Sequence, residues 1–253
     1  MSEKGPSRWT LGAISLASAA LGVVGVMAYD RIGAGGEANR AEIETVVRDY
    51  ILTHPEILPQ AMANLQARET GKLVSANRAA LEKPYAGAWA GAKDGDVVLV
   101  EFFDYACGYC RASLGDIERL LKEDPKLKVV FRELPILSAD SEQAARVSLA
   151  AAEQGRFGDF HSAMYQAGRP SPATIAAAQA KSGLDAAKAG DSARSAAVQR
   201  ELENNVGLAR TLGFNGTPAW VVGDQALNGA VGYDALKQAI ADARKGKAAE
   251  PKG

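Results

Sequence analysis

The stretch VVLVEFFDYACGYCRASL, residues 97–114, leads from an apolar run directly into two cysteines that are separated by two residues. Residues 96–105 are rich in Val and Phe, a composition that predicts a buried central strand. A helix is predicted to begin at the cysteines and to end before Pro125. KLKVVFREL, residues 126–134, is a second predicted strand. Strand, helix and strand in this order form a βαβ unit, whose right-handed crossover makes the two strands parallel.

The chain after this unit is predicted to be mainly helical. Residues 139–212 are rich in Ala at helical spacing, and we expect a helical insertion over about 138–212. Breaks are predicted at GRPSP, residues 168–172, and around Gly183 and Gly190, because Gly and Pro interrupt helices. The insertion therefore consists of several short helices.

The C-terminal part of the chain predicts a hairpin and a final helix. TPAWVVGDQALNG, residues 217–229, contains two strand-like pieces joined by Gly223-Asp224, a two-residue hairpin signal. A last helix is expected from Tyr233 to about Lys245, and residues 247–253 are expected to form a disordered tail. Together these elements predict an α/β domain over residues 94–246.

The N-terminal segment predicts export. From Trp9 to Tyr29 the chain has 21 residues without a charge, preceded by Lys4 and Arg8, and this length can cross a hydrocarbon core. We interpret residues 1–30 as a transmembrane signal anchor, and the alternative is a signal peptide cleaved after the small-residue sequence ending at Ala28. Either interpretation exports everything after residue 30, so the cysteines face an oxidising compartment, the periplasm. The Gly-rich residues 31–39 are expected to be a linker.

Residues 40–93 form a second expected domain, which is helical at least over residues 40–83. A first helix is predicted to end near Pro55, and a second helix follows it. Apolar residues form a seam along the second helix at Leu58, Met62, Leu65, Leu73, Ala76 and Ala80. Such a seam packs either on another subunit, which would make the chain a homo-oligomer, or on the chain's own domain.

Charge and cysteine content narrow the class of protein. The 253-residue chain has a formal net charge of −1, which argues against a nucleic-acid-binding protein because such proteins usually carry a clustered basic surface. Its two cysteines, Cys107 and Cys110, are too few for a disulfide framework. The pair is therefore expected to serve a redox or a metal-binding function.

The spacing of the cysteines favours redox chemistry. At the first turn of a helix, residues three apart share a face, so Cys107 and Cys110 can form a disulfide without backbone movement. As a purely structural cross-link this disulfide would add only about 2 kcal/mol to the stability of the fold, because the loop that it closes is so short. As a reactive site it is well placed, since the helix N-terminus favours the thiolate of Cys107.

A pair of cysteines at this spacing has three other possible uses. Structural zinc needs four ligands, and only His54 and His161 supplement the cysteines. Covalent haem needs His directly after the second cysteine, where this chain has Arg111. Two thiolates alone can hold Cu(I), so a copper-tolerance module that uses Cys107 and Cys110 remains the alternative to an enzyme.

Three segments carry a family resemblance. VEFFDYACGYC (100–110), GRFGDFHSAMY (155–165) and FNGTPAWVVGDQALNGAVGYDAL (214–236) resemble the DsbA family of exported thioredoxin-fold thiol oxidoreductases. DYILTHPEILPQAM (49–62) resembles the N-terminal region of proteins of the suppressor-of-copper-sensitivity C type. The resemblance implies a thioredoxin fold with a helical insertion, which needs no cofactor other than the Cys107–Cys110 disulfide.

The resemblance also implies roles for individual residues. Cys107 corresponds to the solvent-facing nucleophile and Cys110 to the buried resolving thiol. Thr217 and Pro218 correspond to the loop whose proline is cis and whose backbone pairs with an extended substrate. Glu101 corresponds to an acid beneath the active site that relays the proton of Cys110, although an edge strand would instead leave Glu101 in water.

Residues around these positions suggest how clients are bound. Tyr109, next to Gly108, is expected to be exposed and to offer a flat apolar surface to an unfolded chain. Trp220 and Phe214 flank the Thr-Pro loop and either line a peptide groove or pack in the core. His161 is expected to pack or to form hydrogen bonds rather than to act in catalysis.

The sequence departs from the strongly oxidising members of the family. The neutral pair Gly108-Tyr109 replaces a dipeptide containing His, and Thr217 replaces the hydrophobic residue that is usual before the cis proline. These features resemble exported isomerases and imply a milder potential. We therefore expect a thiol-disulfide oxidoreductase that favours isomerase or reductase activity over oxidase activity. Its expected partners are misoxidised or unfolded exported proteins and a membrane redox partner.

Overall fold

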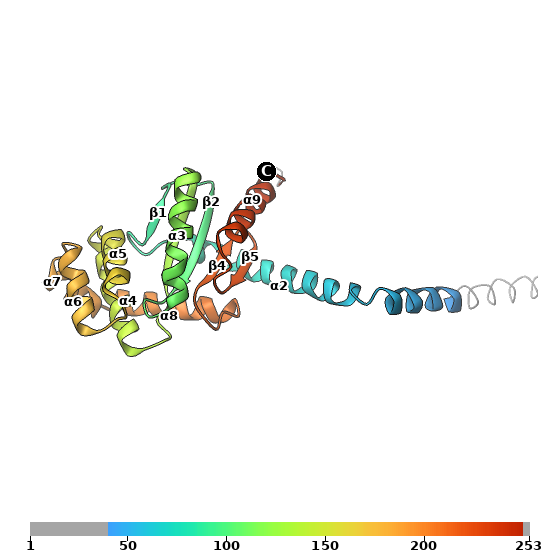
Figure 1. Ribbon diagram of the computed structural model, residues 1–253, viewed down its shortest axis with the longest axis horizontal. Helices are drawn as coiled ribbons and strands as arrows, with labels where there is room; N and C mark the ends of the chain where they lie inside the picture. Colours follow the sequence, from blue (N-terminus) through green and yellow to red (C-terminus); the bar gives the residue numbers. More distant parts are fainter. Residues whose placement is uncertain (1–39, 250–253) are drawn as a thin grey trace, which may run out of the picture. The chain divides into compact units, whose positions relative to one another are not determined.

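The computed structural model describes residues 40–249 of the chain (Figure 1). The described residues fall into two units, which are divided between Asn64 and Leu65. The predicted anchor or signal peptide and the linker of residues 31–39 lie outside the described residues. Within residues 40–249, no helix combines the length and the apolar character that a membrane span requires.

The second unit is built on a mixed five-stranded sheet with the strand order β1-β3-β2-β4-β5. The strands are β1 (Trp89–Gly91), β2 (Val97–Phe103), β3 (Leu127–Glu133), β4 (Ala219–Val222) and β5 (Gln225–Asn228). Strands β2 and β3 are parallel and joined by α3 (Gly108–Glu123), which confirms the predicted βαβ unit. Strands β4 and β5 are antiparallel and joined at Gly223-Asp224, which confirms the predicted hairpin.

Strand β1 is a correction to the sequence analysis. Residues 40–93 were expected to be helical and to precede the catalytic domain, yet Trp89–Gly91 pairs antiparallel with β3 and forms the edge of the same sheet. Three residues are too few to show the alternation by which strands are recognised, so only their pairing with β3 identifies them.

Alternating side chains of β2 and β3 build a core on each face of the sheet. On one face, Leu99 and Phe103 pack with Val129 and Phe131 and with residues of α3 and of α9 (Tyr233–Ala249). On the other face, Val100, Phe102 and Val130 pack with residues of α2 (Ile57–Glu82) and α8 (Ala196–Thr211). Strand β2 is therefore buried on both sides, as its continuous apolar run predicts.

The helical insertion consists of α4 (Ala139–Glu153), α5 (Phe157–Ala167), α6 (Pro172–Lys181), α7 (Ala186–Ala193) and α8. In Figure 1, α4 to α7 gather beside the sheet. The breaks at residues 168–172 and near Gly183 are confirmed. The break at Gly190 is wrong, because Gly190 lies within α7 and the chain turns after Ala193, where the Ser195 side chain caps α8.

The segment before the sheet forms two helices, over residues 40–53 and in α2, as predicted. The buried residues of α2 are Val74 and Leu81, which pack on the sheet in the second core. The predicted seam uses other positions, and its large side chains Leu58, Met62, Leu65 and Leu73 are exposed. Within the second unit, Leu65 and Leu73 are therefore not the residues through which α2 packs on the sheet.

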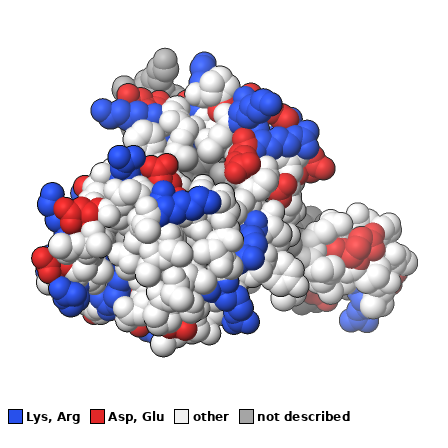
Figure 2. Space-filling view, turned by 60° about the vertical axis from the view of Figure 1, so that its left-hand side comes forward, with Lys and Arg blue, Asp and Glu red and all other residues white. Residues whose placement is uncertain are grey.

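Helix α9 ends later than predicted. It continues to Ala249, into the segment that was expected to be a disordered tail, while residues 250–253 lie outside the described part. On the face in Figure 2, basic and acidic side chains are interspersed rather than gathered by sign. That mixture is typical of a solvated surface.

Candidate active site

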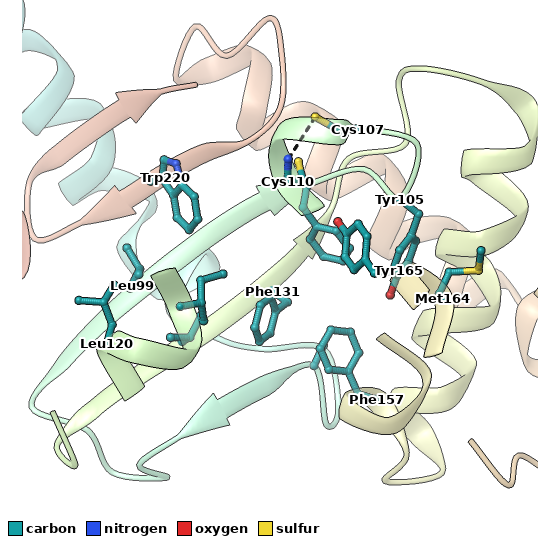
Figure 3. Close-up of a cluster of buried hydrophobic side chains, with 14 of the residues drawn as sticks. Leu99, Tyr105, Cys107, Cys110, Leu120, Phe131, Phe157, Met164, Tyr165 and Trp220 are labelled. Atoms are coloured by element: carbon teal, nitrogen blue, oxygen red, sulfur yellow. Dashed lines mark hydrogen bonds between the residues drawn. The ribbon is translucent and has the colours of Figure 1, made fainter. Parts of the chain in front are cut away.

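Cys107 stands at the N-terminus of α3. It is the N-cap residue, with an extended backbone, and its sulfur accepts a hydrogen bond from the backbone N–H of Cys110 at 3.4 Å (Figure 3). The sulfur thus faces unpaired N–H groups and the positive end of the helix dipole. This arrangement stabilises negative charge on the Cys107 sulfur.

The Thr217-Pro218 loop lies beside the same sulfur. The Cys107 thiol donates a hydrogen bond to the Thr217 carbonyl at 3.2 Å, and the Thr217-Pro218 peptide bond is cis, as the resemblance implied. The Thr217 hydroxyl is buried and has no hydrogen-bond partner among the described residues. The structure therefore brings together the four residues 107, 110, 217 and 218.

Cys110 is more deeply buried than Cys107. No part of Cys110 is exposed, and 6% of Cys107 is exposed, so Cys107 is the outer sulfur but is largely covered. Burial raises the pKa of the Cys110 thiol, and a charge on Glu101 raises it further. Cys110 therefore needs a neighbouring proton acceptor before it can attack.

Glu101 is that neighbouring group. Strand β2 is central, so Glu101 is 1% exposed, and the alternative of an edge residue in water is wrong. Burial, with a smaller contribution from Cys107, raises the pKa of Glu101 to about 8. A carboxyl group with a pKa near neutral pH can both take up and release a proton, which suits a relay for Cys110.

Asp104 is a site residue that the sequence analysis missed. Its carboxylate accepts hydrogen bonds from the backbone N–H groups of Ala106 at 2.7 Å and Leu137 at 2.9 Å. These bonds hold the turn before Cys107 against the loop that follows β3. An Asp two residues before a turn position is an Asx-turn signal, and the sequence DYAC contained it.

A second buried acid, Glu133, lies at the end of β3. In the parallel pairing Glu101 is opposite Phe131 and Glu133 is opposite Phe103, so both acids point to the same face of the sheet. Glu133 is 1% exposed, and neither of its oxygens has a hydrogen-bond partner among the described residues. Burial raises the pKa of Glu133 well above its usual value. The sequence signal was the same as for Glu101, an acid in an apolar strand.

The remaining predicted residues separate into surface and core. Tyr109 is 70% exposed and Gly108 is exposed, as expected of residues that meet a client. Trp220 and Phe214 are buried, so of the two predicted alternatives they pack in the core and do not line a peptide groove. His161 is buried, contacts the Tyr105 hydroxyl at 3.1 Å and packs against Phe157, in agreement with a packing role.

The described residues offer few metal ligands. Over residues 40–249, no three His, Cys, Asp or Glu side chains come together in a way that could hold a metal ion. Cys107 and Cys110, which are both free thiols, are the only cysteines in the sequence. Any metal held here would have to accept two sulfur ligands, as Cu(I) does.

The geometry suits thiol-disulfide exchange. A thiolate at a helix N-terminus attacks a disulfide, and a second thiol one turn further on can displace it from the resulting mixed disulfide. The cis-proline loop leaves backbone groups beside the outer sulfur, where an extended chain can add hydrogen bonds. The two thiols and the backbone groups of the cis-proline loop thus all belong to the second unit.

Comparisons with protein families give two matches. Residues 98–241 match the model of the DSBA-like thioredoxin domain. Residues 39–70 match the model of the copper resistance protein ScsC N-terminal domain. The first match contains the cysteines and the Thr-Pro loop, and the second contains the helical segment before the sheet.

Solved structures of similar fold come from several bacteria. A thioredoxin-like oxidoreductase from Silicibacter pomeroyi DSS-3 is 36% identical, with a TM-score of 0.61 over 65% of this chain and 95% of that chain. The thiol-disulfide exchange protein alpha-DsbA2 from Wolbachia pipientis is 28% identical, with a TM-score of 0.64 over 70% and 97%. ScsC from Proteus mirabilis in a transitional conformation is 29% identical, with a TM-score of 0.61 over 83% and 98%.

Two curated proteins also match part of the chain. Na(+)/H(+) antiporter NhaA 3 of Salinispora tropica is 25% identical over 166 residues, which are 64% of this chain and 26% of the antiporter. NhaA 1 of Salinispora arenicola is 24% identical over 165 residues, again 64% of this chain and 25% of the antiporter. The chain thus spans about a quarter of the length of these relatives.

Proposed function

Since the chain belongs to the DSBA-like thioredoxin domain family and is a thiol-disulfide oxidoreductase, we propose that it acts on disulfides of exported proteins, as an isomerase or reductase more than as an oxidase. The observation that carries this proposal is the Cys107 sulfur, which accepts the Cys110 N–H at the N-terminus of α3 and contacts the Thr217 carbonyl. This sulfur is the nucleophile.

The reaction proceeds in two displacements. The Cys107 thiolate attacks a client disulfide, the client S–S bond breaks, and one client sulfur leaves as a thiolate while a mixed disulfide forms. In the reductase reaction the ionised form of Glu101 accepts the proton of Cys110, and the Cys110 sulfur attacks the Cys107 sulfur, which releases the second client sulfur as a thiolate. Two electrons pass from the dithiol to the client. In the isomerase reaction a client thiol attacks instead, and the dithiol is regenerated.

The preference for isomerisation or reduction is supported by the residues around the thiolate. Gly108 and Tyr109 bring no positive charge to the Cys107 sulfur, whereas a protonated His between the cysteines would do so. A less stabilised thiolate makes a weaker oxidant, because the potential follows the stability of the reduced form. Thr217 stands where strongly oxidising members of the family have a hydrophobic residue before the cis proline, and this difference also supports a milder potential.

A homo-oligomer through residues 40–83 is also proposed. Large apolar side chains of this segment are exposed, among them Ile43 at 56%, Val46 at 61% and Met62 at 71%. A contiguous exposed apolar surface on a helix is typical of an association interface. Several catalytic domains held together would keep a client near an active site between successive exchanges.

The periplasm is the proposed location, with a tether to the inner membrane through residues 9–29, or a soluble form if that segment is cleaved. The uncharged run of 21 residues supports this proposal. A dithiol in an oxidising compartment needs a reductant, so a membrane redox partner that delivers electrons to Cys107 and Cys110 is part of the proposal.

Trapping of clients tests the proposed enzyme. A Cys110→Ala variant cannot resolve mixed disulfides, so it should retain exported proteins bound through Cys107, and reducing agent should release them. Cys107→Ala is the matched control, because it removes the attacking sulfur and keeps Cys110. The wild-type chain should restore activity to scrambled ribonuclease. Absence of trapped clients together with absence of ribonuclease recovery would contradict the proposal.

Cu(I) binding is a second candidate function, favoured by the match of residues 39–70 to the copper resistance protein ScsC N-terminal domain. Cys107 and Cys110 would hold Cu(I) through their two sulfurs. Competition for Cu(I) with a chromogenic chelator tests this function, and the double variant Cys107→Ala and Cys110→Ala should lose the metal. A chain that binds Cu(I) but traps no clients would favour the binding module over the enzyme.

A further inference from the structure

Two Asn-Gly pairs lie close to the Thr217-Pro218 loop. Asn215-Gly216 directly precedes Thr217, and Asn228-Gly229 ends the β4–β5 hairpin. All four of these residues are exposed. In an Asn-Gly pair the backbone nitrogen of the glycine can attack the side-chain amide of the asparagine, because glycine has no side chain to hinder the approach. Both pairs are thus accessible to water.

The pair at 228 is held by hydrogen bonds. The Gly229 N–H donates to the Pro218 carbonyl at 2.8 Å, and the Gly229 carbonyl accepts from the Trp220 indole N–H at 2.9 Å. Asn228 pairs with Ala219 in the sheet. For the Gly229 nitrogen to attack the Asn228 side chain, the hairpin must first open locally, and such an opening costs free energy.

The pair at 215 has no such restraint. The Gly216 N–H has no hydrogen-bond acceptor among residues 40–249. No atom outside residues 215–217 lies within 4 Å of the position that a Gly216 side chain would occupy, and Gly229 is equally uncrowded, so the two pairs differ in hydrogen bonding and not in crowding. The nitrogen of Gly216 is therefore free to react where that of Gly229 is bound.

We propose that Asn215 is a site of spontaneous deamidation, with water as the only co-reactant. The Gly216 backbone nitrogen attacks the Asn215 side-chain carbon, a C–N bond forms, and the side-chain amide leaves as ammonia. Water then opens the cyclic imide at either carbonyl, which gives aspartate or isoaspartate. No electrons are transferred, and the products carry one carboxylate more than the original chain.

The modified loop changes the proposed active site, and this consequence rests on the proposed function. Isoaspartate routes the main chain through one additional carbon, which displaces Thr217 relative to the Cys107 sulfur that its carbonyl contacts at 3.2 Å. Misplacement of a reacting group by about 1 Å can cost up to about a hundredfold in rate. We therefore expect the isoaspartate form to lose most of its exchange activity.

Ageing of the full chain tests the site itself. The chain is incubated at mildly alkaline pH and then digested with trypsin together with a protease that cleaves before Asp. Cleavage before Asp224 places Asn215 and Asn228 on different peptides. We expect Asn215 to convert at least about tenfold faster than Asn228, since a local opening that costs about 1.4 kcal/mol already slows a reaction tenfold. Equal rates, or faster conversion at Asn228, would overturn the proposal.

Two variants separate the chemistry from its effect on activity. Gly216→Ala should suppress conversion, and the backbone at 216 accepts a side chain without strain or contact. Asn215→Asp adds the charge without lengthening the main chain and should keep most of the activity. If Asn215 converts and the exchange activity is unchanged, the proposed displacement of Thr217 is contradicted, while the deamidation itself is not. Unaltered Asn215 in aged wild-type chain would contradict the deamidation itself.

Discussion

At the scale of single residues, two acids of the central strands, Glu101 and Glu133, are almost completely buried in the core. Carboxyl groups are rarely fully buried without partners, because removing their charge from water is costly. Their pKa values are raised by that burial, Glu101 to about 8. Glu101 is consequently mostly protonated at neutral pH in the folded chain, and its proton uptake links folding to pH.

This linkage predicts that the stability of the reduced chain falls as the pH rises above 7. The folded chain holds a proton on Glu101 that the unfolded chain has already released, so raising the pH favours unfolding. For a pKa of about 8, the free energy of unfolding should fall by about 1.4 kcal/mol between pH 7 and pH 9. Urea unfolding at the two pH values measures the difference.

Glu101→Gln provides the control for this prediction. The neutral amide cannot lose a proton, so the contribution of Glu101 to the fall should disappear, while the contributions of Glu133 and Cys110 remain. His161 does not interfere, because burial lowers its pKa to about 3, below the pH window. An equal fall in wild type and Glu101→Gln would show that Glu101 does not hold the proton.

At the scale of elements, Arg132 joins α2 to the sheet and to α8. Its guanidinium group, in β3, donates to the carbonyl groups of Ala80, Leu81 and Lys83 at the end of α2. It also donates to Glu201 at 3.1 Å and Asn205 at 2.7 Å in α8. The last carbonyl groups of a helix have no partner within the helix, so Arg132 satisfies them from outside.

We predict that Arg132→Leu destabilises the chain by about 3–5 kcal/mol, because it leaves Glu201 and the α2 carbonyl groups buried without their partner. The midpoint of urea unfolding should fall accordingly. Arg119→Ala is the control, since Arg119 forms an exposed ion pair with Glu123, and such pairs contribute at most about 1 kcal/mol. If both variants lost a similar amount of unfolding free energy, the buried interactions of Arg132 would contribute no more than an exposed ion pair, which would contradict the prediction.

At the scale of the whole molecule, the proposed oligomer can be tested through the seam of α2. Met62→Glu places a charge at an apolar position that is 71% exposed in the single chain. If this position lies in an interface, the buried charge should weaken association by several kcal/mol, and the solution mass should fall. Light scattering of the full chain in detergent measures the mass.

Gln60→Glu adds the same charge at an exposed polar position of α2 and should leave the mass unchanged. A monomeric mass for the wild-type chain would remove the proposed oligomer and, with it, one support for isomerase over oxidase. A mass that is unaffected by Met62→Glu would place any interface elsewhere.

Local patterns predicted most of the architecture. The parallel βαβ unit, the hairpin at Gly223-Asp224 and the helix beginning at the cysteines are each decided by residues close together in the chain, where periodicity and turn chemistry act. The same holds for Cys107 and Cys110, whose spacing places both on one helical turn. The cis bond at Pro218 was implied by family resemblance and not by these patterns.

What the sequence by itself determined is therefore the order of elements and the dithiol at a helix N-terminus. Tertiary structure alone decided that Trp89–Gly91 joins the sheet, that Asp104 ties two loops together and that Glu101 and Glu133 lie buried on one face. The physical reason is distance along the chain. Burial and partner choice come from contacts between segments that are far apart in sequence, and no local period records them.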